Sequence, residues 1–446
     1  MKQDYNRDIY KHLEEVLNRV DKLESTIKDD KVEIRRLNDK IDYLEKENTQ
    51  LKKENTRLKN DNERLRRIIN NDSTNSSLPP STDKKPTKAA NEYNHRTKSK
   101  NKQGGQKGHK GTTLTKESVQ EKIKNGEFDV PKEYNSEVTY GDIIKSLTVL
   151  LYSEGVVAND RIADIINAIS NNTLNIASGT IYNFCTSFSN LSDKSIKQIE
   201  NDLLNSEVLY TDGTVVTENG KQSIIRNASN KNSVLYAALD SKKIESMKAS
   251  KIWNEFMGIF VHDHETGLYH FGTNHGECNV HLERYLIKNL EESKNSWSKD
   301  MISFLSGINK AKKKLKIEGK SCFTEDQLDN YSKRFDEIIQ LGYKQNKTTE
   351  GKCAKEDEKK LLNRLKKYKE NHLLFAHNFA VEYSNNMSER DLRKCKNREK
   401  MAGGFRTAKG REMYCNILSI IETIKRRKMN IIENILKIFQ GNPAIF

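Results

Sequence analysis

Residues 208–216 read Val-Leu-Tyr-Thr-Asp-Gly-Thr-Val-Val, an apolar and β-branched run with one carboxylate, Asp212, at its centre. Such a composition favours a buried strand, in which a lone charge is unfavourable. A buried carboxylate has to be paired, hydrogen-bonded or bound to a metal ion, so Asp212 is the first candidate functional residue. The alternative is a turn aspartate, because Asp-Gly is also a hairpin signal.

The residues that follow extend this strand into a larger layout. A tight turn at Asn219-Gly220 predicts an antiparallel meander. Two more strands, a helix and a fourth strand are expected in that order, over residues 222–226, 233–239, 243–254 and 258–261. The fourth strand ends at Asp263. A β-β-β-α-β run with an acid on its first strand and another after its fourth is typical of a ribonuclease-H-like core, in which both carboxylates converge on divalent metal.

Charge and composition narrow the class of protein. The chain has 446 residues, 34% hydrophobic content and a net charge of +15. This net positive charge indicates a polyanionic partner, and nucleic acid is favoured over a membrane surface. A genome that encodes many lysines would explain part of the excess positive charge. No signal peptide and no apolar run of roughly 20 residues is visible. We expect a cytoplasmic, nucleoid-associated bacterial protein without membrane contact. The six cysteines form no C-x-x-C pair.

The first 70 residues repeat an apolar seam every seven positions from Ile9 to Ile69. Such persistence predicts a coiled coil, and Leu at one core position with Asn at the other favours a parallel homodimer in fixed register. A single surface helix would need a wider apolar stripe. The residues that we expect to form the dimer seam are Leu37, Ile41, Leu44, Asn48, Leu51, Asn55, Leu58, Asn62 and Leu65.

Residues 71–138 lack periodicity and are rich in Ser, Pro, Gly, Asn and Lys. We interpret them as a basic flexible linker whose Lys107, His109 and Lys110 contact DNA phosphates; a plain solvated linker is the alternative. Residues 139–205 are expected to be helical. Within them, 159–169 and 178–188 have the spacing of a helix-turn-helix DNA-binding region, although any helical hairpin looks similar.

The first part of the core, residues 206–290, continues past Asp263. We expect a strand over 269–274 and a helix that opens at Cys278. His281 and Arg284 lie one turn apart on that helix and are expected to face the metal centre and contact DNA phosphates. A zinc site is the less favoured alternative, with ligands His270, His275, Cys278 and His281.

Residues 291–381 are strongly charged and lack proline, which indicates a helical insertion without a core of its own. Residues 382–446 complete the core. There a capped helix places Glu389 one turn before Arg393, a spacing that a surface ion pair would also explain. The basic stretch that follows contains Gly403-Gly404 and suits DNA phosphates. The expected DNA contacts of this region are Arg390, Arg393, Lys396, Arg398, Lys400, Arg406, Lys409 and Arg411.

Several longer motifs resemble the transposases of the insertion-sequence-66 family. They are N-S-S-x-P-P-S-T-D at 75–83, G-G-Q-x-G-H-x-G at 104–111, C-x-x-H-x-x-R at 278–284, N-N-x-x-E-R-x-L-R at 385–393 and G-G-F-R at 403–406. The family belongs to the DDE transposases. The resemblance therefore implies that Asp212, Asp263 and Glu389 are the catalytic, metal-binding triad of a ribonuclease-H-like core in an α+β fold.

The chain departs from the family pattern in three places. Residues 112–130 contain no cysteine where members carry a Cys-rich zinc-binding segment. Gly213 replaces the Glu of a D-E-T motif, and Ser384 replaces the Asp of a D-N-N motif. Neither change removes a triad carboxylate. DNA recognition would then fall to the linker, the helical region and the coiled coil.

This resemblance implies a transposase that cuts DNA at the ends of an insertion sequence and joins them to target DNA. Two Mg²⁺ ions, with Mn²⁺ as a substitute, would serve the three acids. Accessory proteins of the same element are further expected partners. One alternative is a catalytically idle, transposase-derived dimeric DNA-binding regulator, and another is a ribonuclease with the same core.

Overall fold

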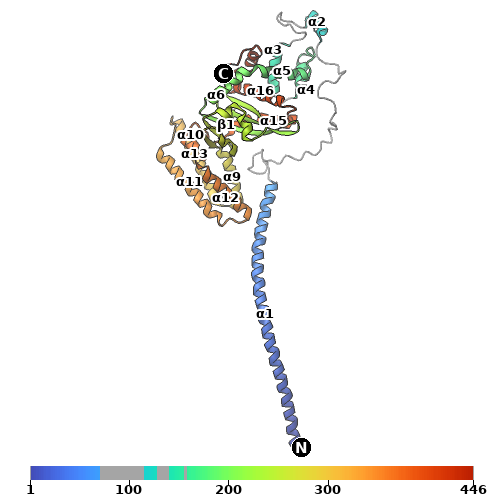
Figure 1. Ribbon diagram of the computed structural model, residues 1–446, viewed down its shortest axis with the longest axis vertical. Helices are drawn as coiled ribbons and strands as arrows, with labels where there is room; N and C mark the ends of the chain where they lie inside the picture. Colours follow the sequence, from blue (N-terminus) through green and yellow to red (C-terminus); the bar gives the residue numbers. More distant parts are fainter. Residues whose placement is uncertain (1, 71–114, 128–139, 155–157, 445–446) are drawn as a thin grey trace.

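The computed structural model describes residues 2–70, 115–127, 140–154 and 158–444, without the side chains of residues 2–10, 60 and 63–70. Its first element is a single helix of 69 residues, α1 (Lys2–Asn70), which extends away from the rest of the chain (Figure 1). Half of the surface of Leu37, Leu44 and Leu51 is exposed on it. The predicted helix is therefore present, with its apolar seam open to solvent.

A five-stranded mixed sheet forms the centre of the globular part. Its strands are β1 (Val208–Glu218), β2 (Lys221–Ser229), β3 (Val234–Leu239), β4 (Ile259–His262) and β5 (Asn274–Glu277). They lie in the order β3-β2-β1-β4-β5. The first three pair antiparallel, whereas β4 is parallel to β1 and β5 is parallel to β4. The turn between β1 and β2 uses positive φ angles at Asn219 and Gly220, as a tight hairpin requires.

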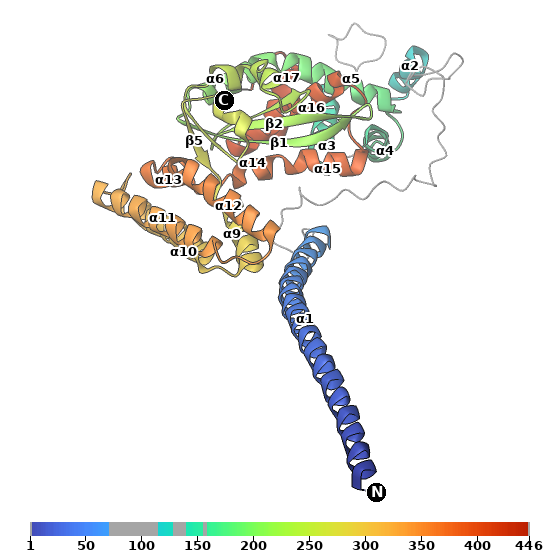
Figure 2. The ribbon, with the colours of Figure 1, turned by 60° about the horizontal axis from the view of Figure 1, so that its bottom comes forward.

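The helices that precede β1 and the helices near the C-terminus pack together beside the meander half of the sheet (Figure 2). They share one large apolar cluster with the strands. α16 contacts β3, α5 and α6, and α17 contacts α3 and α5. The elements of this part are α2 (Lys116–Lys124), α3 (Asp142–Glu154), α4 (Asn159–Ile169), α5 (Ser178–Leu191), α6 (Asp193–Leu204), α7 (Ile244–Lys248), α8 (Lys251–Glu255), the 3-10 turn η2 (Thr266–His270), α16 (Ala408–Arg426) and α17 (Ile431–Phe439).

The charged stretch after β5 forms a separate helical bundle, drawn in yellow to orange in Figure 1. Its helices are α9 (Asn279–Ser293), α10 (Ser296–Ile317), α11 (Glu325–Asn346), α12 (Lys352–Lys367) and α13 (Lys369–His377). The expected helical insertion is present, but it has an apolar interior: Trp297, Leu305, Phe335 and Leu362 are completely buried in a second apolar cluster, which the bundle shares with the sheet residues Val208, Tyr210 and Val261. A few large side chains spaced along the helices suffice to build it.

A buried carboxylate, Glu277, joins this bundle to the sheet. Arg364 Nη2 of α12 donates to its Oε2 at 2.7 Å, and the Tyr269 hydroxyl donates to its Oε1 at 2.6 Å. Burial alone would raise the pKa of Glu277, but its contacts with His264 and the other donors hold the pKa well below the usual range. The charged Glu277 therefore fixes the end of β5 against the bundle.

Three predicted elements differ in detail. The single helix expected over 243–254 is two short helices, α7 and α8, which break at Ala249-Ser250. The strand expected over 269–274 is η2 followed by β5, so pairing begins only at Asn274. The helix that carries Glu389 is divided into α14 (Asn386–Asp391) and α15 (Arg393–Ala402).

Helices cover both edges of the sheet. The backbone N–H groups of Val234 and Tyr236 on β3 donate to the hydroxyls of Thr423 and Ser419 on α16, at 3.1 and 2.9 Å. At the opposite edge, Asn371 of α13 donates to the carbonyl of His275 on β5 at 2.8 Å. Edge strands with open backbone groups invite pairing with other chains, and these contacts remove that opportunity.

Among the described residues, the structure has no helix with both the length and the apolar character needed to cross a membrane.

Candidate active site

Strand pairing brings Asp212, Asp263 and Cys278 to one end of the sheet. Tyr210 on β1 lies opposite Val261 on β4. If the parallel register is extended two residues further along both strands, Asp212 lies level with Asp263. His262 on β4 lies opposite Glu277 on β5, so the next residues, Asp263 and Cys278, are also level. Residues that are far apart in the chain therefore meet because parallel strands end at the same edge.

Asp212 is half-buried and is held by the backbone of β1 and by the Asn227 side chain on β2. The Gly213 N–H donates to its Oδ1 at 2.6 Å, and its own N–H donates to Asn227 Oδ1 at 3.0 Å. Burial raises the pKa of Asp212 to about 6, and the charge of Asp263 acts in the same direction, against the opposing effect of the Lys396 cation. The two acids are thus close enough to repel each other.

Polar contacts dock the short helix α14 onto the sheet and bring Glu389 to the same place. Asn385, just before α14, donates from Nδ2 to the Thr211 carbonyl at 2.9 Å. From the strand side, Asn227 Nδ2 donates to Ser388 Oγ at 3.2 Å and to Asp391 Oδ2 at 3.0 Å. Asn385, Ser388 and Asn227 are completely buried, so these contacts replace water that the groups have lost.

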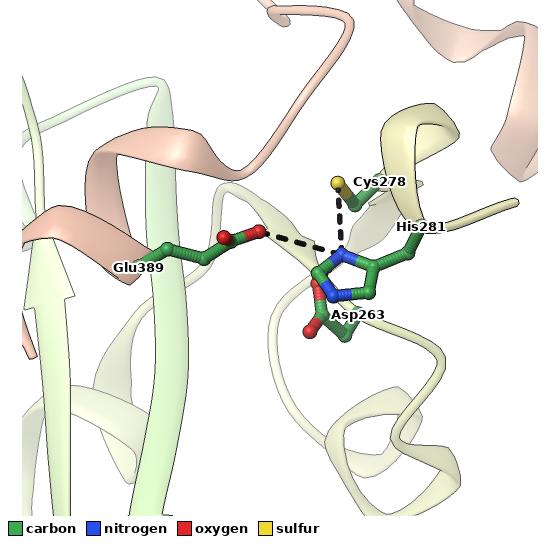
Figure 3. A group of neighbouring side chains, drawn as sticks. All are labelled: Asp263, Cys278, His281 and Glu389. Carbon is green, nitrogen blue, oxygen red and sulfur yellow. Dashed lines mark hydrogen bonds and ion pairs between the residues drawn. The ribbon is translucent and has the colours of Figure 1, made fainter. Parts of the chain in front are cut away.

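Four side chains from three segments meet at one point: Asp263 after β4, Cys278 and His281 at the start of α9, and Glu389 on α14 (Figure 3). His281 Nδ1 lies 2.9 Å from Asp263 Oδ1, 3.4 Å from Glu389 Oε1 and 3.4 Å from Cys278 Sγ. One ligand atom from each of the four residues lies within 4.8 Å of all the others. Asp263 Oδ1 and Glu389 Oε1 are buried oxygens that both face the His281 imidazole. The group has the residue types and spacing of a metal site.

The charge of His281 compensates the two carboxylates in this arrangement. Burial alone would lower the pKa of His281, but its contacts with Asp263 and Cys278 outweigh that effect and raise the pKa to about 10. The imidazole therefore carries a positive charge at neutral pH. On its far side, Arg284 Nη1 lies 3.3 Å from His281 Nε2.

A model of the "Transposase IS66 family" matches residues 144–413, which is more than half of the chain. The chain belongs to the IS66 transposase family. The resemblance inferred from the motifs is thereby confirmed. A second model, described as a "family of unknown function (DUF6444)", matches residues 20–115. No curated protein matches the chain.

In this IS66-family transposase, the three acids predicted as a triad all lie at one end of the sheet. His281 and Arg284 lie beside them, on the first turns of α9. The alternative zinc set is not assembled, because His275 Nδ1 contacts His262 Nε2 at 3.1 Å and His270 lies in η2. Cys278 and His281, two of the four residues in that set, instead join two of the acids.

The predicted DNA-contact residues fall into three groups. The first group, Lys107, His109 and Lys110, lies outside the described residues. The second group is not freely exposed, and in it Lys396 is half-buried near Asp212. Arg411 is 2% exposed and pairs with Glu218 and Asp240, while Arg398 stacks on the rings of Tyr152, Phe405 and Tyr414, so both side chains serve the interior of the fold. The exposed members are Arg390, Arg393, Lys400, Arg406 and Lys409.

Two residues of the candidate site were not predicted from the sequence to lie beside the acids. Asn227 supports both Asp212 and α14, and no clear sequence signal marks it. Cys278 was considered only as a ligand of the less favoured zinc site. Its signal is the Cys-His spacing of three at the first turn of a helix, which places both side chains on one face.

Proposed function

We propose that this IS66-family transposase cuts and joins DNA phosphodiester bonds at a DDE centre formed by Asp212, Asp263 and Glu389. The observation that carries the proposal is the meeting of these acids at one end of the sheet, although more than 170 residues separate the first from the last. The strand order β3-β2-β1-β4-β5, three antiparallel and then two parallel, supports a ribonuclease-H-like core.

The residues of this centre fit a hard divalent cation. Asp263 Oδ1 and Glu389 Oε1 are buried oxygens that face the same point, and Asp212 lies close enough to Asp263 for their charges to interact. Asp212, Asp263 and Glu389 would hold Mg²⁺, with Mn²⁺ as a substitute. When bound, such ions activate a water or 3′-hydroxyl nucleophile and stabilise the leaving oxygen. Asn227 and Asn385 keep the acids in position.

Exposed cations around the centre support double-stranded DNA as the substrate, both at element ends and at the target. Arg390, Arg393 and Lys400 lie on α14 and α15, the helices that carry Glu389 and follow it. Arg406 and Lys409 continue this basic surface beyond Gly404. Flexible cationic side chains suit phosphate contacts, which position DNA without reading its sequence. The linker residues Lys107, His109 and Lys110 would extend these contacts.

The helix α1 supports a parallel coiled-coil homodimer as the working form. Its two heptad core positions remain exposed in a single chain, including Ile41 at 52% and Leu58 at 53% of their surface. A seam of this kind needs a partner helix, and a second copy of the chain supplies the same pattern in register. Dimerisation would give the protein two centres, one for each end of an element.

Cleavage assays on single acid variants test the DDE assignment. Asp212→Asn, Asp263→Asn and Glu389→Gln should each reduce Mg²⁺-dependent cutting of a duplex that carries the element's terminal repeats by at least about 1,000-fold, because each removes charge that the transition state needs. DNA binding in a gel-shift assay should remain. Glu382→Gln, an exposed acid seven residues before Glu389, is the matched control and should cut normally.

The same assay separates the rival functions. Cutting at the terminal repeats with Mg²⁺ supports a transposase with an active centre. Binding to the duplex without any cutting, with or without Mg²⁺, would instead support the dimeric regulator. Cleavage restricted to an RNA–DNA hybrid would support a ribonuclease. Cutting at the wild-type rate by any of the three acid variants would reject the triad.

A further inference from the structure

The site contains ligand chemistry that the DDE proposal does not use. Beside the oxygens of Asp263 and Glu389, it presents the thiol of Cys278 and the imidazole of His281 (Figure 3). Asp212 is not a member of this four-atom group. Mg²⁺ takes oxygen ligands in an octahedral arrangement and keeps several waters, whereas thiolate and imidazole select transition metals. The set of donors therefore suits a softer ion than Mg²⁺.

The spacing of the four atoms matches a tetrahedral ion. Zn²⁺ holds nitrogen and oxygen at about 2.0 to 2.2 Å and sulfur at about 2.3 Å, which separates neighbouring ligand atoms by about 3.3 to 3.7 Å. His281 Nδ1 lies 3.4 Å from both Cys278 Sγ and Glu389 Oε1, and 2.9 Å from Asp263 Oδ1. Small side-chain adjustments would complete the geometry without moving the backbone.

The burial of the ligands distinguishes this cluster from a chance meeting of surface acids. Cys278 is 1% exposed, and its Sγ accepts the Asn385 backbone N–H at 3.2 Å. The facing oxygens, Asp263 Oδ1 and Glu389 Oε1, are buried, and His281 Nδ1 lies 2.9 and 3.4 Å from them. Two carboxylates held this close together favour a cation between them. The fold thus holds all four ligands in place around one point.

We propose that the protein, free of DNA, binds one transition-metal ion of the Zn²⁺ class through Asp263, Cys278, His281 and Glu389. This rests on the proposed function and deepens it, because it names the class of ion that occupies one position of the DDE centre and leaves Asp212 for another. Binding displaces the protons of the thiol and of His281 Nδ1. The ring keeps its proton on Nε2, and the displaced protons pass to the solvent.

A Co²⁺ titration of the full-length protein tests the site without DNA or catalysis. One equivalent of Co²⁺ should produce a thiolate-to-cobalt charge-transfer band in the near ultraviolet and the intense visible bands of a tetrahedral ion. One equivalent of Zn²⁺ should remove both, because the same ligands prefer it, and a 100-fold excess of Mg²⁺ should leave them unchanged.

Variants assign the ligands. Cys278→Ser should remove the near-ultraviolet band and weaken Zn²⁺ binding by about 100-fold, the upper end of the loss seen even for residues that only support ligands. His281→Gln should weaken it similarly. The matched controls are Cys322→Ser and Cys353→Ser, cysteines outside the cluster, and both should retain the band. Asp212→Asn should also retain it. Circular dichroism checks that each variant is folded.

Three results would overturn the metal proposal: a wild-type protein without the thiolate band, a folded Cys278→Ser protein with an unchanged spectrum, or displacement of Co²⁺ by the Mg²⁺ excess. The outcome is independent of the cleavage assay. A protein that shows the band but never cuts DNA refutes the DDE centre alone. One that cuts with Mg²⁺ but shows no band refutes the transition-metal site alone.

Discussion

At the scale of single residues, Glu358 shows how the fold compensates a buried charge with hydrogen-bond donors. Glu358 of α12 is completely buried in the helical bundle. Trp297 Nε1 and Asn295 Nδ2 donate to its Oε1 at 2.7 and 2.8 Å, and Thr349 Oγ1 and Asn346 Nδ2 donate to its Oε2 at 2.5 and 2.9 Å. All these donors are neutral. They take the place of the water that the carboxylate loses, and they connect the start of α10 and the end of α11 to the middle of α12.

Replacing this carboxylate should destabilise the bundle. In Glu358→Gln, an amide NH₂ group would face donors that need an acceptor, so we expect the free energy of unfolding to fall by about 3 kcal/mol. Urea unfolding at pH 7 measures the loss. Glu356→Gln, an exposed acid on the same helix, is the matched control and should lie within about 0.5 kcal/mol of wild type. If Glu358→Gln had the same free energy of unfolding as wild type, the stabilising role of the carboxylate would be contradicted.

Lowering the pH should remove the stability that the ionised Glu358 carboxylate contributes. Burial alone would raise the pKa of Glu358, but its hydrogen bonds outweigh this and lower it below the usual value of 4.5. A lowered folded pKa means that the carboxylate stabilises the fold above pH 4.5 and that this stability is lost as the pH falls further. The stability difference between wild type and Glu358→Gln should therefore shrink from pH 5 towards pH 3. A difference that stays constant over this range would reject the assignment.

At the scale of elements, the position of Glu389 depends on a helix of only six residues, α14. So short a helix has little stability of its own, and its place is determined by contacts with the sheet. Asn385 makes two of them, to the Thr211 carbonyl and to Cys278 Sγ, and Asn227 reaches Ser388 and Asp391. A polar clamp thus aligns the third acid with the first two.

Loosening this clamp should impair catalysis more than folding. Asn385→Ala removes the side-chain contact to Thr211, and a misplacement of about 1 Å at a reacting group can slow a reaction roughly 100-fold. We expect kcat for DNA cleavage to fall by that order, with KM and DNA binding little changed. Asn363→Ala, an exposed asparagine on α12, is the control. A parallel loss of DNA binding would indicate general misfolding instead.

Patterns within a few residues were predicted well. The helix expected over 159–169 is α4, and the strand run that begins at 208 is β1 to β4, because alternating apolar residues and a local turn at Asn219 act over short distances. The core of the bundle escaped prediction. Trp297, Phe335 and Leu362 lie on three different helices among many charged residues, and only packing brings them together.

The site was predictable in its acids but not in its arrangement. Asp212 was found from its unfavourable place in an apolar strand, and Glu389 from the family motif. The link between Cys278 and Asp263 depends on the register of β4 and β5, which no local pattern specifies. The zinc alternative therefore paired Cys278 with nearby histidines in sequence, although its neighbours in space are acids.

At the scale of the whole molecule, α1 places the proposed dimerisation seam far from the globular part that holds the proposed active site. A helix of 69 residues is about 100 Å long at 1.5 Å per residue. Among the described residues, its contacts with the rest of the chain are at its end, beside α12. An arm of this length can hold two globular parts together while leaving each free to engage its own stretch of DNA.

Charges placed in the seam should separate the proposed dimer. Leu51→Lys with Leu58→Lys puts four like charges into the centre of a two-stranded coil, where burial is unfavourable. Sedimentation equilibrium should then report a monomer at concentrations where wild type is a dimer. Thr49→Lys with Thr56→Lys adds the same charge outside the core positions and should leave the dimer intact. A wild-type monomer would refute the coiled coil.

The order of the acids along the chain has a consequence for synthesis on the ribosome. The strands that carry Asp212 and Asp263 and the entire bundle precede Glu389. A polypeptide released prematurely, anywhere within the bundle, still includes the arm and the complete sheet but lacks the third acid and α16, which covers β3. If Asp212, Asp263 and Glu389 form the proposed triad, such truncated products would be unable to cut DNA.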